Sequence, residues 1–258
     1  MGVNTSKIIV ITGASGHLGR CYAAKAADIA SCILIDRDQQ ILTELVAQLP
    51  DPSRHKTYAV DLANEDQRNV AIQSILEQNE VIDSLVNCAA YTGDTIQDGW
   101  VAPFEEQSID AWRAALEVNL TSCFDLCQKL YPRIKLSEDG NILNIGSIYG
   151  DLGPDMRLYS GTKMGNPAAY AASKGAIAQL TRWLATVLAP NVRVNCVSPG
   201  GIIRNQPKRF IEAYKKKVPL QRMATEDDVV GAMIFLTLGS SQYITGHNLV
   251  VDGGFSTW

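Results

Sequence analysis

Tyr170 and Lys174 are the residues whose types and spacing first suggest chemistry in this chain. Residues four apart on a helix lie on one face, about one turn from each other. A cation one turn from a phenol favours the phenolate form, which prepares the hydroxyl to exchange a proton with a bound molecule. The same spacing also occurs on solvated helix faces, so the interpretation depends on the elements that position the pair.

A glycine-rich turn stands where a dinucleotide-binding fold needs one. The β-branched run 7–12 predicts a buried parallel strand, and 20–29 has a helical pattern. Glycines between a strand and a helix let the backbone approach a pyrophosphate, whose charge the helix N-terminus favours. The alternative is an ordinary turn that needs three glycines. The predicted cofactor contacts in this turn are Gly13, Ser15, Gly16, His17, Leu18 and Gly19.

Asp36 closes the next predicted strand, 31–36, and lies 17 residues after Gly19. A carboxylate at this position accepts hydrogen bonds from the adenosine ribose and repels a 2′-phosphate. The sequence therefore predicts NAD as the cofactor. Arg37 can pair with a 2′-phosphate, so NADP stays open as the alternative.

The rest of the chain continues to alternate between predicted strands and helices. Nearly continuous apolar strands in such an order predict an α/β fold with a Rossmann-type, doubly wound parallel sheet in a single domain, 1–258. Ligands of these folds bind at the carboxyl ends of the strands. The further strands are predicted at 56–60, 82–86, 141–146, 192–197 and 248–251, with an active-site insertion at about 150–166 and a lid segment at about 204–223.

Composition excludes several functional classes. The 258 residues are 46% hydrophobic with a net charge of −4, which supports a large core and argues against a nucleic-acid partner. No apolar run approaches the ~18 residues of a membrane span, so no membrane partner is expected. The six cysteines show no metal-ligand spacing, and we expect free thiols, no metal and a cytoplasmic location.

The chain contains, in this order, the motifs Thr12 to Gly19, Asp61-Leu62, Asn87 to Ala90, Asn119, Ser147, Tyr170-x-x-x-Lys174, Ser198 to Gly200 and Val251 to Gly254. Together they resemble the short-chain dehydrogenase/reductase family over essentially the whole chain. The resemblance implies a seven-stranded sheet, nicotinamide-dependent hydride transfer and a catalytic tetrad of Asn119, Ser147, Tyr170 and Lys174. By this analogy Tyr170 is the general acid/base, Ser147 orients the substrate oxygen, Lys174 holds the nicotinamide ribose and Asn119 supports a relay water. The implied cofactor contacts beyond the glycine turn and Asp36-Arg37 are Asp61, Leu62, Asn87, Ala89, Tyr170, Lys174, Pro199, Gly200 and Ile202.

Three features depart from the family pattern. The glycine spacing 13, 16, 19 looks like that of epimerase and dehydratase relatives. The gap of 23 residues from Ser147 to Tyr170 is long, so the insertion should overhang the active site. Pro199-Gly200 is followed by Gly-Ile-Ile-Arg204-Asn205, where the family often has a threonine that contacts the nicotinamide amide. The insertion also has a weak similarity to members associated with surface-glycan or flagellin modification.

The predicted activity is interconversion of a secondary alcohol and a ketone on a polar small-molecule substrate such as a sugar or sugar phosphate. Cations in the insertion and the lid favour an anionic substrate, although a solvated surface explains them equally well. Alternatives are an epimerase or lyase that retains NAD, a 3-oxoacyl-thioester reductase and, in a different class, a nucleotide sensor without catalysis. The cations are Arg157, Lys163, Arg204, Lys208 and Arg209.

An apolar stripe predicts a homo-oligomer, with a tetramer expected from the family resemblance. The stripe carries Trp112, Leu116, Leu120, Phe124 and Cys127 at helical spacing, and the helix of Tyr170 offers a second face of small residues. Such a stripe belongs either to the core or to a subunit interface.

Overall fold

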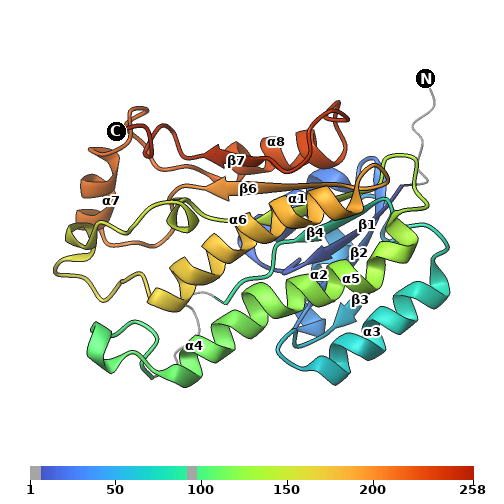
Figure 1. Cartoon of the computed structure of the whole chain (residues 1–258), viewed down its shortest axis with the longest axis horizontal. Helices are drawn as coiled ribbons and strands as arrows, with labels where there is room; N and C mark the ends of the chain where they lie inside the picture. Colours follow the sequence, from blue (N-terminus) through green and yellow to red (C-terminus); the bar gives the residue numbers. More distant parts are fainter. Residues whose placement is uncertain (1–6, 92–97) are drawn as a thin grey trace.

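The computed structural model of the chain describes residues 7–91 and 98–258, and the remainder of the predicted domain lies outside this description. Within it, seven strands form one parallel sheet in the order β3-β2-β1-β4-β5-β6-β7 (Figure 1). The strands are β1 (Lys7–Thr12), β2 (Ala30–Asp36), β3 (Lys56–Ala59), β4 (Ser84–Asn87), β5 (Asn141–Ile145), β6 (Arg193–Pro199) and β7 (Asn248–Val251). The predicted fold class is confirmed.

Helices cover both faces of the sheet because its inner strands are buried on both sides. One core layer packs β1 and β2 against α1, α2 and α8, and the other packs the sheet against α3, α5 and α6. The α-helices are α1 (His17–Ala26), α2 (Gln39–Gln48), α3 (Glu65–Gln78), α4 (Ile109–Leu116), α5 (Ser122–Ile134), α6 (Ala168–Leu188), α7 (Lys208–Lys215) and α8 (Glu226–Thr237).

The boundaries differ from the sequence prediction at two places that matter for the site. Helix α1 begins at His17, three residues before the predicted start, because Gly16 is already the extended N-cap residue. The helix predicted around Trp112 is interrupted by a π-helical turn, η3 (Glu117–Thr121), where the Ser122 N–H donates to the carbonyl oxygen of Glu117. Such π turns are rare and often lie at functional sites.

The predicted insertion and lid pack against each other. Tyr159 of the insertion lies 5.4 Å from Phe210 of α7 between ring centroids, and the Lys217 ammonium pairs with Asp155. The two segments share a buried apolar cluster. Its buried members are Leu158, Tyr159, Phe210, Tyr214, Val218 and Met223.

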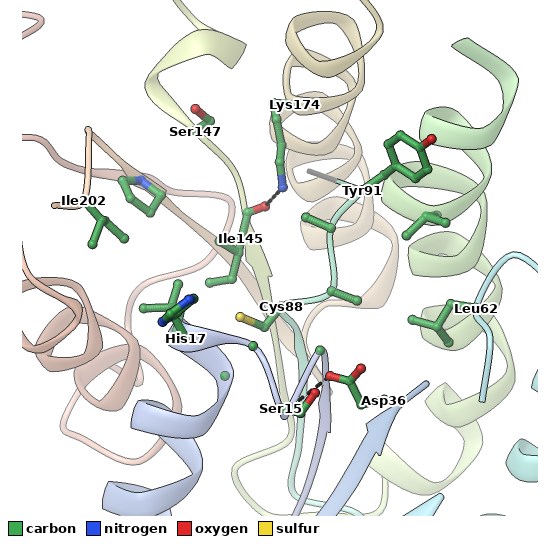
Figure 2. Close-up of a pocket in the computed structure, with 18 of the residues that line it drawn as sticks. Ser15, His17, Asp36, Leu62, Cys88, Tyr91, Ile145, Ser147, Lys174 and Ile202 are labelled. Atoms are coloured by element: carbon green, nitrogen blue, oxygen red, sulfur yellow. Dashed lines mark hydrogen bonds between the residues drawn. The ribbon is translucent and has the colours of Figure 1, made fainter. Parts of the chain in front are cut away.

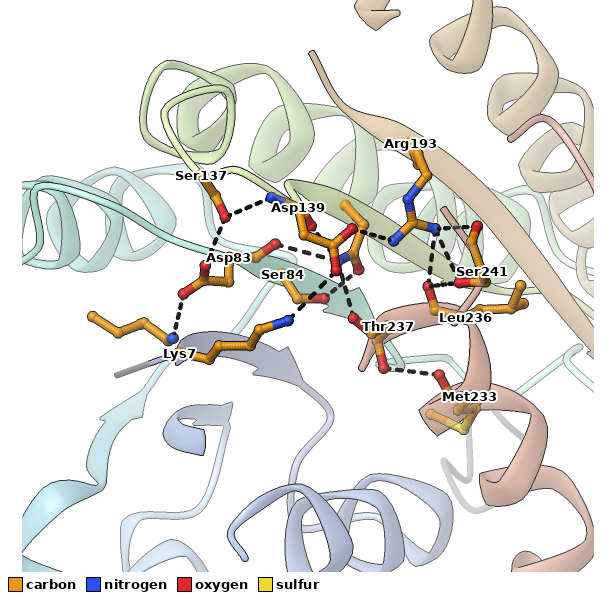
Figure 3. Close-up of polar contacts among 12 residues, drawn as sticks. Lys7, Asp83, Ser84, Ser137, Asp139, Arg193, Met233, Leu236, Thr237 and Ser241 are labelled. Atoms are coloured by element: carbon orange, nitrogen blue, oxygen red, sulfur yellow. Dashed lines mark hydrogen bonds and ion pairs between the residues drawn. The ribbon is translucent and has the colours of Figure 1, made fainter. Parts of the chain in front are cut away.

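A polar network joins the amino ends of four strands, opposite the end where ligands bind in such folds (Figure 3). Asp139 accepts from Arg193 at 3.0 Å and pairs with Lys7 at 3.4 Å. Arg193 also donates to the carbonyl oxygen of Leu236 at 3.2 Å, and the Asp83 carboxylate accepts from the Ile8 N–H at 2.7 Å. These contacts tie β1, β4, β5, β6 and α8 together.

Candidate functional site

A cavity of about 500 Å³ opens at the carboxyl ends of the strands. Ser147 and Lys174 lie at one end of it, and Ser15 and Asp36 lie at the other (Figure 2). The predicted site residues that line the cavity are Gly13, Ser15, Gly16, His17, Leu18, Gly19, Asp36, Arg37, Asp61, Leu62, Ala89, Ser147, Tyr170, Lys174, Pro199, Gly200 and Ile202.

The glycine turn is shaped for close approach of the backbone. Gly13 has φ +64°, and a Cβ there would lie 2.6 Å from the Ala89 Cα atom. A Cβ on Gly19 would lie 2.1 Å from the carbonyl oxygen of Gly13, so any side chain at Gly19 would force β1 and α1 apart. The turn therefore presents backbone and the α1 N-terminus to the cavity, as a pyrophosphate requires.

Asp36 is fixed at the end of β2 by two backbone donors. Its Oδ2 atom accepts from the Ser15 N–H at 2.9 Å, and its Oδ1 atom accepts from the Arg37 N–H at 2.7 Å. Each carboxylate oxygen retains a lone pair for a ribose hydroxyl. Arg37 is exposed and lines the same cavity.

Asp61 and Leu62 follow β3 and line the cavity on the same side as Asp36. The Asp61 N–H donates to the side-chain oxygen of Gln67 at 2.8 Å, and its Oδ1 atom accepts from the Ala63 N–H at 3.0 Å. Among the described residues, the Asp61 Oδ2 atom and the Leu62 N–H make no hydrogen bond, which leaves one acceptor and one donor for a ligand.

Lys174 is held at the other end by the sheet. Its Nζ atom donates to the carbonyl oxygen of Ile145 at 2.7 Å (Figure 2) and lies 5.8 Å from the ring centroid of Tyr170. The side chain is almost fully buried. The Ser147 Oγ atom accepts from the Tyr149 N–H at 3.2 Å, which leaves its own proton free to donate.

Asn119 and Asn87 do not line the main cavity. They line a second, small cavity beside it, which Lys174 also lines. The Asn119 Oδ1 atom accepts from the Tyr91 N–H at 2.6 Å, and its Nδ2 atom donates to the Ser173 Oγ atom at 2.9 Å. Asn87 donates to Asn144 at 2.9 Å. Both asparagines are buried, and their side chains bridge neighbouring elements.

The predicted cations are divided between separate surfaces. Arg204 lines the main cavity and pairs with Glu226 at 3.0 Å. Arg157 and Arg209 line a different groove, and Arg157 pairs with Asp155 at 2.8 Å. Lys163 and Lys208 are exposed and belong to neither set of lining residues.

Tyr149, Tyr159 and Tyr214 form a group of phenols that the sequence analysis did not single out. Tyr159 donates to the Tyr149 hydroxyl at 2.9 Å, and burial raises the pKa of Tyr149 well above its ordinary value. The Tyr214 hydroxyl accepts from the Gly201 N–H at 2.6 Å, and burial raises its pKa to about 12. These groups stay protonated at neutral pH. In the sequence, the position of Tyr149 two residues after Ser147 was the signal that could have placed this phenol near the site.

Cys88 also lines the cavity, and burial raises the pKa of its thiol to about 12. A protonated thiol is a poor nucleophile, so the site offers no cysteine chemistry there. Across residues 7–91 and 98–258, no cluster of His, Cys, Asp and Glu has the arrangement of a metal site. The same residues contain no helix that is long and apolar enough to cross a membrane.

Comparisons with known proteins agree with this geometry. A family model described as enoyl-(acyl carrier protein) reductase matches residues 13–256. Post-translational flagellin modification protein A of Campylobacter coli is 30% identical over 97% of this chain and 98% of its own length. This chain belongs to the short-chain dehydrogenase/reductase family. The predicted family and its dependence on NAD(P) are therefore confirmed.

Solved structures show which cofactors similar members bind. A short-chain dehydrogenase from Leptospira borgpetersenii with bound NAD⁺ is 35% identical, with a TM-score of 0.85 and coverage of 98% of this chain and 93% of that one. A gluconate 5-dehydrogenase from Burkholderia cenocepacia in complex with NADP and tartrate is 26% identical, with a TM-score of 0.84 and coverage of 98% and 96%.

Proposed function

We propose that this protein is an NAD-dependent oxidoreductase that interconverts a secondary alcohol and a ketone on a small polar substrate. The observation that carries the proposal is one cavity with Asp36 and Ser15 at one end and Lys174 and Ser147 at the other (Figure 2). A bound nicotinamide would supply the hydride acceptor or donor at the second end.

In this proposal Tyr170 is the general acid/base that exchanges the proton of the substrate oxygen. The Ser147 hydroxyl donates to the same oxygen, because its Oγ atom already accepts from Tyr149. Lys174 uses one of its three N–H donors on Ile145. The other two remain for the ribose of the cofactor, and the charge stabilises negative charge that develops on Tyr170.

Asn119 supports a relay water beside Lys174, with which it shares the small second cavity. The bonds of Asn119 to Tyr91 and Ser173 fix the backbone of the π turn. We assign to Asn119 a positioning role for the end of a proton path, and no direct contact with the substrate.

The cofactor we propose is NAD. Both oxygens of Asp36 face backbone donors, so the carboxylate is fixed where a ribose diol would bind. A 2′-phosphate there would meet the carboxylate charge. The exposed Arg37 side chain offsets only part of this repulsion, since it is free to point into solvent. Asp61 and Leu62 then supply an acceptor and a donor for the adenine edge.

The substrate class we propose is a polyhydroxylated molecule such as a sugar or a sugar phosphate. Arg204 and Gln206 line the cavity and provide donors. The gluconate 5-dehydrogenase among the similar structures supports a polar substrate for this arrangement. A 3-oxoacyl-thioester reductase is the second candidate. It is favoured by the similarity to a 3-oxoacyl-[acyl-carrier-protein] reductase of Thermotoga maritima, 28% identical over 96% of this chain, and by the apolar cluster of the insertion and α7.

We also propose a cytoplasmic homotetramer. The α4–α6 side of the molecule leaves several large apolar side chains uncovered, which a second copy of the chain would bury. These are Trp112, Phe124, Trp183 and Val187, with exposed fractions of 37%, 40%, 53% and 48%.

The test is a screen of purified protein with NAD or NADP against gluconate, D-threitol, cyclopentanol and, with the reduced cofactors, acetoacetyl thioesters. We expect NADH formation from a polyol, and thermal stabilisation by NAD greater than that by NADP. Reduction of the thioester alone would favour the second candidate. Purified protein that carries stoichiometric, non-dialysable NAD and gives no net reduction with any substrate would instead indicate an epimerase or lyase.

A further inference from the structure

A buried arginine in α3, Arg68, bonds to the loop after β3 that lines the cavity. Its side chain is 2% exposed, although arginine is rarely fully buried unless it is paired. Its Nη1 atom donates to the carbonyl oxygen of Leu62 and, at 2.8 Å, to the Glu117 carboxylate. Its Nε atom donates to the Asp125 carboxylate at 3.0 Å.

These three acceptors belong to three different elements. Leu62 lies in the loop after β3 that lines the cavity, Glu117 begins the π turn η3, and Asp125 is in α5. Asp125 also pairs with Lys129 at 2.6 Å, so its carboxylate is held from both sides. The planar guanidinium fixes the directions of its donors, which makes Arg68 a rigid link between the loop and the π turn.

The connections continue from both partners into the site. Gln67, the residue before Arg68, accepts from the Asp61 N–H, so α3 fixes both residues that offer a donor and an acceptor to the adenine. Two residues after Glu117, Asn119 bonds to the Tyr91 N–H and to Ser173 of α6. Arg68 is therefore bonded at once to the adenine end and to the turn that carries a member of the tetrad.

We infer that Arg68 is a positioning residue that holds the adenine end of the cofactor site and the π turn of Asn119 in one fixed arrangement. The inference rests on the proposed function for the location of the adenine. Occupancy of the adenine end orders Leu62, and through Arg68 and Glu117 it reduces the opening of the π turn. Burying these charges costs desolvation free energy, and apolar residues would stabilise the same contact equally well. The ion cluster therefore fits a role beyond stability.

AMP is the probe that tests this inference, because it fills only the adenine end and requires no knowledge of the substrate. Calorimetry gives its Kd, and amide hydrogen exchange reports the peptide that contains residues 116–123. In the unmodified protein, we expect AMP to bind and to slow exchange in this peptide. The Arg68→Met variant should bind AMP about tenfold more weakly, because one charge-assisted hydrogen bond to Leu62 is lost. At saturating AMP it should show no protection of 116–123.

Arg193→Met is the matched control, since Arg193 also bonds to a carbonyl oxygen and a carboxylate but at the opposite end of the sheet (Figure 3). It should lower the melting temperature and leave both AMP readouts unchanged. If Arg68→Met does not fold, Arg68→Lys provides the test, because it keeps the charge but loses the planar guanidinium with its fixed donor directions. It should show the same weaker AMP binding and the same loss of protection. An unchanged Kd, or protection of 116–123 that persists in the variant, would overturn the inference. Failure of the unmodified protein to bind NAD or AMP would instead refute the proposed function.

Discussion

The Nζ atom of Lys174 lies 2.7 Å from the carbonyl oxygen of Ile145 and 5.8 Å from the ring centroid of Tyr170. A buried ammonium is thus anchored to the end of β5 and kept beside the phenol. The first of these contacts uses a backbone acceptor, so it persists whatever side chain stands at 145. The arrangement places a fixed positive charge at the end of the cavity where proton and hydride exchange are proposed.

Removal of the carboxylate at Asp36 should change the cofactor preference. In Asp36→Ala the ribose loses its acceptor, and a 2′-phosphate meets Arg37 without repulsion. We expect the ratio of Kd for NADP to Kd for NAD to fall by at least about tenfold, as one charge-assisted hydrogen bond implies. Titration of both cofactors by calorimetry or fluorescence measures it.

Asp38→Ala provides the matched control for this change. The Asp38 side chain caps α2 by accepting from the Gln40 and Ile41 N–H groups at 2.9 and 3.0 Å. Loss of this cap should lower the unfolding free energy by about 1 kcal/mol and leave the preference for NAD over NADP unchanged. An Asp36→Ala variant with the original preference would show that Asp36 does not select the cofactor.

His55 should make stability depend on pH below neutrality. Its Nδ1 atom accepts from the Cys32 N–H at 3.0 Å and its Nε2 atom lies 2.9 Å from the Pro50 carbonyl oxygen, which fits the neutral ring. Burial lowers the pKa of His55 below its ordinary value of 6.5. The unfolded chain therefore takes up the proton first as the pH falls. The stabilisation that the neutral His55 ring contributes is complete above about pH 6.5, and it is lost as the pH falls through the lowered pKa of His55 in the folded protein.

Denaturant unfolding between pH 8 and pH 5 measures this effect. The unfolding free energy of the unmodified protein should decline below pH 6.5, and His55→Gln should flatten that decline. His247→Gln, at an exposed position, should leave the decline in place. Equal pH profiles for the unmodified protein and His55→Gln would exclude His55 as the cause.

The local geometry of the candidate site could be predicted from sequence because it depends on short-range patterns. The glycine turn, Asp36 and the four-residue spacing of Tyr170 and Lys174 each follow from one strand–turn–helix unit or one helical turn. The π turn could not be predicted, because the contacts that stabilise it join residues far apart in sequence. Arg68 and its partner Glu117 are 49 residues apart, and Tyr91 and its partner Asn119 are 28 residues apart. The pairing of the insertion with α7 is equally non-local.

The network at the amino ends of the strands should affect stability alone. Arg193→Met leaves part of the Asp139 charge without a partner in a poorly solvated position (Figure 3). We expect a loss of about 2–4 kcal/mol in the unfolding free energy, as when a partly buried ion pair is broken. Affinity for NAD should be unchanged. A weaker affinity without loss of stability would contradict this separation of roles.

A charge placed on the exposed apolar side of α6 should disrupt the proposed tetramer. Trp183 is 53% exposed, and in Trp183→Glu a carboxylate would have to be desolvated at the interface. We expect light scattering at micromolar concentration to give a smaller mass than for the unmodified protein. Val70→Glu on α3, which is 72% exposed, should keep the original mass. A monomer mass for the unmodified protein would refute the assembly itself.

The role of Tyr170 is tested most directly by comparing turnover and cofactor binding in Tyr170→Phe. The substitution removes only the hydroxyl, so the ring remains beside Lys174. With the alcohol that gives the strongest NADH signal, we predict a Kd for NAD within about twofold of the original and a kcat lower by about 10²- to 10⁴-fold, the range for loss of a general acid/base. Undiminished turnover in Tyr170→Phe would contradict the account.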